Sequence, residues 1–96
     1  MKDHNEQPLG KAIEDFLNVY NLQDKIDGMR LINSWEHVVG SMIANHTTDL
    51  FVSRKTLFVH LDSAAVRNEL VYAKSLILKN LNKEVGKEVI NDIVFK

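Results

Sequence analysis

Basic and aromatic side chains gather in the middle of this chain, in residue types that can bind nucleic acid. Arg54 and Lys55 occupy the predicted tip of a hairpin, where long cationic side chains can reach phosphate groups. Phe51 and Phe58 flank the tip and could stack on bases if their face of the sheet is open. We expect instead that a helix covers this face, so that both rings belong to the core.

Four more basic residues lie on a long predicted helix. Arg67 and Lys74 are seven residues apart and share one flank of it, whereas Lys79 and Lys83 share a different flank. The helix therefore carries two basic clusters and no continuous basic stripe. All four are candidates for phosphate contacts, together with the two cations at the hairpin tip.

The charge of the chain is unevenly distributed. Residues 1–50 hold four Lys/Arg and eight Asp/Glu, whereas residues 51–87 hold seven Lys/Arg and three Asp/Glu. The basic part suggests an anionic partner, with chance asymmetry of a solvated surface as the alternative. The net charge of the chain is −1 and its pI is about 6.4. Any nucleic-acid binding should therefore be weak and sensitive to salt.

The chain has no residue pattern typical of catalysis or of metal binding. It contains no cysteine, which excludes a disulfide, a zinc ribbon and a thiol nucleophile. Its four histidines, His4, His37, His46 and His60, have no HExxH spacing. We expect His46 to stabilise a helix C-terminus and His60 to pair across a hairpin with Asp49. With no nucleophile motif and no Gly-rich phosphate loop, we expect neither an enzyme nor a cofactor or metal site.

The 96 residues are enough for one domain with a modest core. Residues 1–7 are polar and are predicted to form a disordered tail before a single domain over 8–96. No apolar run reaches the roughly 18 residues that a membrane span needs. The N-terminus also lacks the apolar core of a signal peptide. We therefore expect a cytoplasmic protein with no membrane partner and no small-molecule substrate.

Hydrophobic periodicity divides the chain into helices and strands. Apolar residues recur at helical spacing in three segments and alternate with a period of two in others. The predicted helices are 8–20, 22–46 and 63–85, and the predicted strands belong to a hairpin over 49–62 and to 89–95. Gly28 could break the second helix, and Gly86 is expected to end the third. This ααββαβ order is typical of a small α+β domain.

The predicted hairpin turns at residues 53–56. The tip has no glycine or asparagine, so a two-residue turn would be strained and a four-residue loop is expected. Either turn pairs Val52 with Leu57 and Phe51 with Phe58. The last strand is expected beside the first, in an antiparallel sheet of order 2-1-3. The alternative place beside the second strand needs a parallel pair, which is less common in so small a sheet.

The second predicted helix contains the only tryptophan and a mid-helix glycine. His37, Gly40 and Ala44 fall on the side opposite its apolar stripe. They would form a small-residue face that another helix or a partner could approach closely. The residues expected in the core are Trp35, Val39, Leu57, Val59, Leu70 and Ile77.

Six sequence blocks occur in the order found in one known family. They are Trp35–Gly40, Ile43–Thr47, Lys55–Val59, Ala65–Leu70, Leu81–Gly86 and Asp92–Phe95. Over residues 9–96 the chain resembles the DciA family, formerly catalogued as a domain of unknown function, and is most similar to members from Bacteroidetes-type bacteria. It departs from relatives at Val66, where many carry tryptophan, and at Arg54-Lys55, where a glycine is frequent.

The resemblance implies a KH-like domain with helices packed on a three-stranded antiparallel sheet. It also implies a non-enzymatic role in DNA replication, because DciA proteins bind DNA and assist loading of the replicative DNA helicase without hydrolysing ATP. A DNA-binding member would associate with the nucleoid. Many relatives carry a flexible segment after the last strand that helps to engage the helicase, whereas this sequence stops at Lys96.

Two other functions fit the same residues. A protein-interaction adaptor that never touches nucleic acid would use the exposed sheet edge or the face made by His37, Gly40 and Ala44. A KH-type RNA-binding module fits the predicted fold, but none of the four glycines belongs to a GxxG motif. Clamping of single-stranded RNA in the KH manner is therefore not supported.

Overall fold

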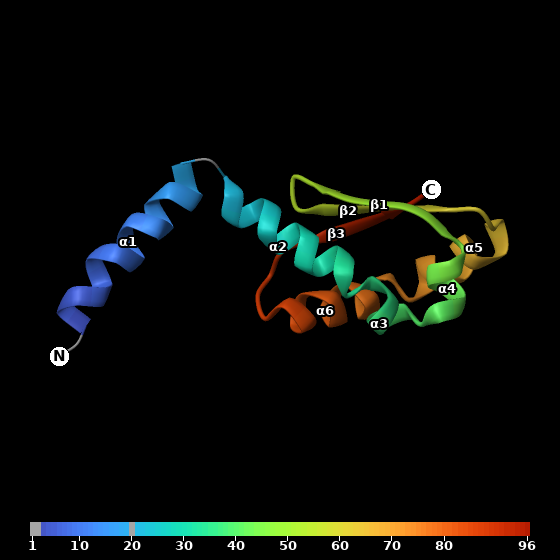
Figure 1. The fold of residues 1–96 in the computed structure, drawn as a ribbon. Coiled ribbons are helices and arrows are strands. Elements are labelled where there is room, and N and C mark those ends of the chain that lie inside the picture. The colour runs from blue at the N-terminus through green and yellow to red at the C-terminus, as the bar shows by residue number, and fades with distance from the viewer. Residues whose placement is uncertain (1–2, 20) are drawn as a thin grey trace.

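The computed structural model describes residues 3–19 and 21–96, and it shows an α+β fold (Figure 1). Its elements in chain order are α1 (Asp3–Val19), α2 (Leu22–Asn33), α3 (Trp35–Val39), α4 (Ser41–Asn45), β1 (Thr47–Ser53), β2 (Thr56–Leu61), α5 (Ala64–Tyr72), α6 (Lys74–Val85) and β3 (Asp92–Phe95). The predicted α+β class is confirmed. Helix α1 begins before the predicted start at residue 8. Residues 1 and 2 of the predicted tail lie outside the described residues, and its disorder stays a prediction.

The sheet is mixed, and its strand order is β1-β2-β3. Strands β1 and β2 are antiparallel, whereas β2 and β3 are parallel, with Thr56 level with Asp92 and Val59 level with Phe95. The predicted antiparallel order 2-1-3 is therefore wrong. The reason is the connection after β2, because a crossover that contains α5 and α6 is long enough to join two parallel neighbours.

The register of the hairpin is confirmed, but its turn is tighter than predicted. Val52 pairs with Leu57, Phe51 pairs with Phe58 and Asp49 pairs with His60. Ser53 also pairs with Thr56, which leaves only two residues in the turn. The expected four-residue loop is wrong, because the twist of the strands favours a two-residue turn even without glycine.

The segment predicted as one helix over 22–46 is three helices. Ser34 separates α2 from α3, and Gly40 separates α3 from α4 with φ 93° and ψ 164°. This backbone conformation is essentially restricted to glycine. A Cβ at Gly40 would have no atom within 4 Å, so the dihedral angles and not a close approach explain the glycine. Gly28, the break suggested by the sequence, lies inside α2.

The helix predicted over 63–85 is also divided. Ser63 caps α5 by accepting a hydrogen bond from the Val66 backbone N–H, and Gly86 ends α6 in the left-handed conformation, both as expected. Between them Ala73, at φ −101° and ψ 8°, separates α5 from α6. Helix α5 buries Leu70, whereas α6 buries Ile77, Leu81 and Val85.

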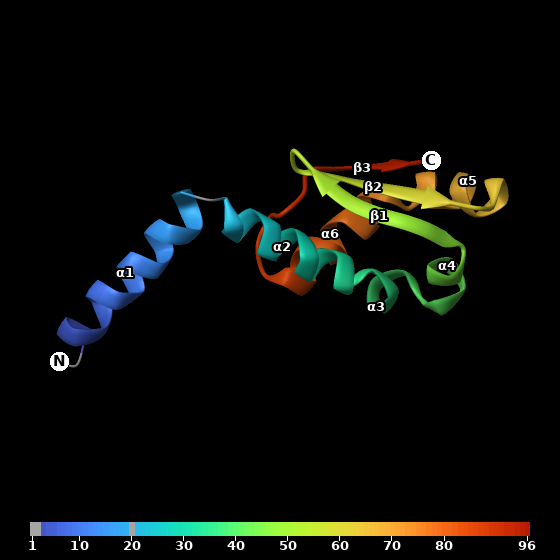
Figure 2. The ribbon, with the colours of Figure 1, turned by 45° about the horizontal axis from the view of Figure 1, so that its top comes forward.

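The core lies between the helices and one face of the sheet (Figures 1 and 2). Of the residues expected there, five are buried: Trp35, Leu57, Val59, Leu70 and Ile77. Val39 is half-buried against them. Trp35 also uses its polar atom, because Nε1 donates to Thr47 Oγ1 at 3.0 Å, and that hydroxyl donates to the Ile43 carbonyl at 2.8 Å.

Strand β3 is shorter than the predicted 89–95, because residues before Asp92 are held by a side chain. The Asn82 amide donates to the Ile90 carbonyl at 2.8 Å, and its Oδ1 accepts from the backbone N–H groups of Val89 at 2.9 Å and Ile90 at 3.1 Å. Ile90 is fully buried. Asn82 thus fixes the loop that leads from α6 into the sheet.

Candidate nucleic-acid interface

The face of the sheet opposite the helices carries a stack of aromatic rings. Alternating residues on a strand point to opposite faces, so Phe51, Phe58 and His60 share a side that Leu57 and Val59 do not. The rings of Phe51 and Phe58 are 4.9 Å apart at an angle of 13°, and those of Phe51 and His60 are 6.0 Å apart at 29°. Figure 2 shows no helix over this face.

The expectation that a helix covers Phe51 and Phe58 is therefore wrong. Phe51 is 41% exposed and Phe58 is half-buried beside it. The helices pack only on the other face because the alternate residues of β2, Leu57, Val59 and Leu61, already supply the apolar side. An open platform of adjacent rings is the arrangement on which unpaired bases can stack.

Cations lie at both ends of this platform. Arg54 and Lys55 form the hairpin tip with φ 51° and 62°, so both adopt the left-handed conformation. The backbone N–H of Asn91 donates to the Lys55 carbonyl at 2.8 Å and ties the turn to the segment before β3. At the other end, Lys96 Nζ lies 5.8 Å from the centre of the Phe58 ring, within cation–π range.

The other four predicted cations do not lie beside the hairpin tip. Lys74 Nζ pairs with Asp92 Oδ1 at 2.9 Å, and this hydrogen bond helps to hold the pKa of Asp92 below its ordinary value. Arg67 is half-buried on α5. Lys79 and Lys83 are exposed, and each is two residues from buried Leu81 on α6. Residues two positions apart lie on opposite sides of a helix, so both lysines point away from the sheet. Of the six, only Arg54 and Lys55 border the aromatic platform.

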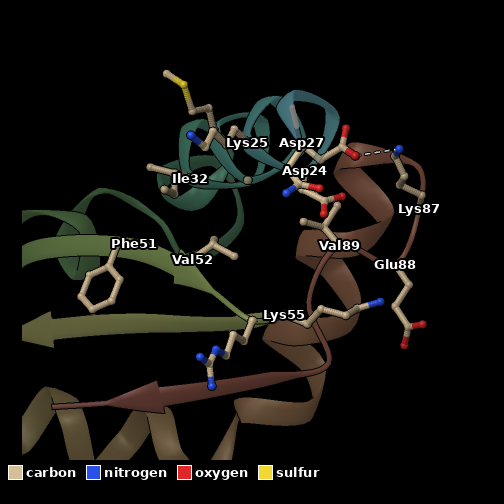
Figure 3. Close-up of a pocket in the computed structure, with 14 residues that line it drawn as sticks. Asp24, Lys25, Asp27, Ile32, Phe51, Val52, Lys55, Lys87, Glu88 and Val89 are labelled. Carbon is tan, nitrogen blue, oxygen red and sulfur yellow. Dashed lines mark ion pairs between the residues drawn. The ribbon is translucent and has the colours of Figure 1, made fainter. Parts of the chain in front are cut away.

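A groove of about 910 Å³ lies between α2 and the hairpin tip (Figure 3). Apolar side chains that include Ile32, Val52 and Val89 line it. The charged residues around it are mixed, with four cations (Lys25, Arg54, Lys55 and Lys87) and three acids (Asp24, Asp27 and Glu88). Helix α2 packs on the hairpin at Gly28, where a Cβ would make an ordinary van der Waals contact with Val52 Cβ at 3.5 Å, so this packing does not require glycine. We call this space the α2–hairpin groove.

One buried carboxylate, Asp27, lies at the edge of the groove. Lys87 Nζ pairs with its Oδ2 at 2.7 Å, and Gln23 Nε2 donates to its Oδ1 at 3.0 Å (Figure 3). Burial acts to raise the pKa of Asp27, but the hydrogen bonds from Lys87 and Gln23, and then the charges of Lys87 and Arg30, outweigh it and hold the pKa below its ordinary value. Asp27 is therefore a paired structural anion.

The residues predicted to form a partner face do not share one surface. His37 lies on α3, with Nε2 3.6 Å from Glu84 Oε2, and Gly40 lies at the junction after α3. Ala44 packs against the core from α4. The face depended on a continuous helix, and the breaks at Ser34 and Gly40 remove it.

Two pairings were missed by sequence reasoning, one on the aromatic platform and one outside it. Lys96 was not singled out, although its place two residues after Val94 puts it on the open face of β3. His46 lies at the C-cap of α4, at a helix end as expected, but the contact of its Nδ1 with Asp62 Oδ1 at 2.8 Å was not foreseen. Neither pairing has a motif that could have identified it.

Among residues 3–19 and 21–96, no group of His, Asp and Glu side chains could hold a metal ion. Within the same part of the chain, no helix is long and apolar enough to cross a membrane.

Comparison with known proteins places the chain in a family. The family described as "Dna[CI] antecedent, DciA" matches residues 8–95. A UPF0232 protein of Corynebacterium glutamicum (strain R) is 32% identical over 87 residues, which make up 91% of this chain and 49% of that protein. A UPF0232 protein of Mycobacterium marinum (strain ATCC BAA-535 / M) is 28% identical over 87 residues, with 91% and 46% covered. The chain spans about half the length of the curated relatives it matches. The family match covers nearly the whole chain, and the chain therefore belongs to the DciA family.

Proposed function

We propose that this chain is a non-enzymatic accessory protein of DNA replication that contacts the replicative DNA helicase and single-stranded DNA and assists helicase loading. Membership of the DciA family supports the helicase role. The observation that supports DNA contact is the open aromatic platform of Phe51, Phe58 and His60, with Arg54 and Lys55 at one end. The KH-like character of the domain is part of the same proposal.

Single-stranded DNA fits this surface better than a duplex. Stacked bases of a duplex hide their faces, whereas unpaired bases can lie on exposed rings such as Phe51. Phosphates on either side of a stacked base would then reach Arg54 or Lys55 at the tip and Lys96 at the far end. The other basic cluster, Lys79 and Lys83, is separated from the rings by α6 itself and has no exposed aromatic residue described beside it.

A titration of fluorescent oligo-dT at low salt tests the DNA contact. Arg54→Glu with Lys55→Glu should weaken binding about tenfold or more, because two phosphate contacts become repulsions. Lys79→Glu with Lys83→Glu makes the same change in charge on the outer face of α6 and should alter affinity less than about twofold. If both pairs weaken binding equally, only net charge matters and the proposed site is wrong.

The rings are tested separately from the charges. Phe51→Ala should weaken oligo-dT binding about tenfold, since one stacked base is worth roughly 1–3 kcal/mol. Leu76→Ala, at an exposed apolar residue of α6, is the control and should bind as the wild type does. Unchanged affinity of the Phe51 variant would leave the platform without a role in DNA binding.

Contact with the helicase is tested by recovery of the replicative helicase on the immobilised chain. An exposed apolar surface near the α5–α6 junction supports a protein contact: Tyr72 is 93% exposed, and Val71 and Leu76 are exposed as well. Tyr72→Ser should reduce the helicase recovered, whereas Arg54→Glu with Lys55→Glu should not. If neither variant reduces the amount of helicase recovered, or if the wild type recovers none, this part of the proposal is wrong.

A further inference from the structure

The open face of the sheet carries an exposed carboxylate, Asp49. Asp49 pairs with His60 across the hairpin, so its side chain shares the face of Phe51, two residues along β1. Asp92, at the start of β3, is neutralised by Lys74 at 2.9 Å. In the part of the chain that the structure describes, no basic group lies within ion-pair distance of Asp49. A free carboxylate repels phosphate, so Asp49 opposes any contact of the platform with a DNA backbone.

A β-bulge sets the direction of the Asp49 side chain. Residues two apart on a regular strand share a face, yet Thr47 points to the core, where its hydroxyl accepts from Trp35 Nε1, and Asp49 lies on the open face. The register shifts between them, and the extra residue, Thr48, donates its hydroxyl to the His60 carbonyl at 3.2 Å. Bulges are over-represented beside functional sites, where they re-aim a side chain.

The carboxylate is also held in place. Asp49 Oδ1 accepts a hydrogen bond from the backbone N–H of Leu50 at 3.0 Å. This bond uses one of about four acceptor positions of the carboxylate, so Oδ2 and part of Oδ1 remain for a ligand. An anchored side chain loses less conformational entropy on binding than a free one, which favours its use in recognition.

Asp49, His60 and Lys96 form a row across the three strands, which we call the cross-strand row. Lys96 donates its backbone N–H to the Val59 carbonyl and accepts from the Leu61 N–H, both at 2.8 Å, so it lies level with His60 at the end of β3. Neighbouring strands are about 4.8 Å apart, which places the backbones of Asp49 and Lys96 roughly 10 Å apart on either side of His60. The row lies beside the stacked rings, with an acceptor at its β1 end and a donor at its β3 end.

We propose that the cross-strand row recognises the edge of an unpaired base stacked on the aromatic platform, and that it favours guanine. The Watson–Crick edge of guanine carries N–H donors at N1 and N2 beside the acceptor O6. The Asp49 carboxylate can accept from both donors while Lys96 donates to O6, and the imidazole of His60 between them can donate or accept. This inference rests on the proposed DNA contact and adds a base preference to it.

Thymine is the base that fits the cross-strand row least well. The one N–H on its Watson–Crick edge lies between two carbonyl oxygens, so a carbonyl would face the Asp49 carboxylate and be repelled by it. Cytosine and adenine each present one amine and fall between guanine and thymine. Stacking and phosphate contacts do not depend on the base, so oligo-dT still binds, but more weakly than a strand that contains guanine.

The base preference is tested by titrating the wild type, at low salt, with a short oligo-dT and with the same strand carrying guanine at its central position. The guanine strand should bind about tenfold more tightly, which is the discrimination expected of one good bidentate pair. Deoxyinosine at that position lacks the N2 amine and should bind with intermediate affinity. Equal affinity for the guanine and thymine strands would overturn the preference and leave the DNA contact intact. Binding of neither strand would contradict the proposed function and this inference with it.

Asp49→Asn tests the carboxylate itself. Asparagine can keep the hydrogen bond to the Leu50 N–H but cannot accept from both guanine donors. The variant should bind the guanine and thymine strands within about twofold of each other, and oligo-dT at least as tightly as the wild type, because a negative charge is gone. Glu69→Gln removes the same charge from an exposed position on α5 and should keep the tenfold preference. A preference that survives in Asp49→Asn, or that is lost equally in both variants, would overturn the role of Asp49.

Discussion

At the scale of single residues, Arg54 and Lys55 combine backbone strain with exposed charge. Both have φ above 50°, which two-residue hairpin turns need and which Asn-Gly adopts at much lower cost. Replacing them by Arg54→Asn with Lys55→Gly should raise the free energy of unfolding by about 1–2 kcal/mol. The same variant should bind oligo-dT more weakly. Urea denaturation and the DNA titration measure the two effects. A variant less stable than the wild type would contradict the claim that the wild-type turn is strained.

The buried pair of Asp27 and Lys87 predicts a dependence of stability on pH. Because the pKa of folded Asp27 is lower than its ordinary value, its charged form stabilises the fold above about pH 4, and this contribution is lost as pH falls through the folded pKa. The difference in unfolding free energy between wild type and Asp27→Asn should therefore be largest near pH 7 and shrink below about pH 4. A difference that grows on acidification would contradict the pairing.

Removing the cation tests the same pair from the other side. Lys87→Met should lower the free energy of unfolding at pH 7 by about 1–2 kcal/mol, since Asp27 keeps only the hydrogen bond from Gln23. Lys25→Met, at an exposed lysine of the same groove, should change it by less than about 0.5 kcal/mol. Thermal denaturation followed by circular dichroism compares them, and equal losses would show that Lys87 has no special role.

At the scale of elements, the breaks between helices decide which residues meet. Gly40→Ala should destabilise the fold by about 1–3 kcal/mol, because alanine rarely adopts φ 93° with ψ 164°. Gly10→Ala, inside exposed α1, should instead be neutral or slightly stabilising. Denaturant midpoints of the two variants provide the comparison. A neutral Gly40→Ala would mean that α3 and α4 can join as one helix, as the sequence pattern suggested.

Local sequence patterns correctly predicted the hairpin and several helix ends, but they did not predict how the elements contact one another. Alternation of apolar residues located the hairpin and paired Phe51 with Phe58, and Ser63 and Gly86 marked helix ends, because each signal depends on neighbours in the sequence. The parallel pairing of β3 could not be found this way, since it depends on where the α5–α6 crossover returns the chain. The breaks at Ser34 and Ala73 have no glycine or proline to mark them.

The same distinction explains the candidate site. Arg54 and Lys55 were identified because a hairpin tip is a local feature. The open face was assigned wrongly because solvent exposure of Phe51 depends on every helix packing on the opposite side of the sheet. Lys79 and Lys83 seemed equivalent to the tip cations in sequence, yet they lie on the outer side of the helical layer.

At the scale of the whole molecule, the helices that form the core and the aromatic platform proposed to bind DNA lie on opposite faces of one thin sheet. This division leaves the aromatic platform free for DNA while the α5–α6 junction remains available to a protein. Binding of one partner should therefore not block the other. A ternary mixture of chain, helicase and oligo-dT should show all three together in one band on size-exclusion chromatography.

The central claim is that single-stranded DNA binds the open face of the sheet. Amide NMR spectra of the ¹⁵N-labelled chain, recorded as oligo-dT is added at low salt, test it most directly. The largest shifts should fall on Phe51, Arg54, Phe58 and Lys96, with little change at Lys79 and Lys83. Shifts concentrated on α6, or spread evenly over all cations, would contradict the claim.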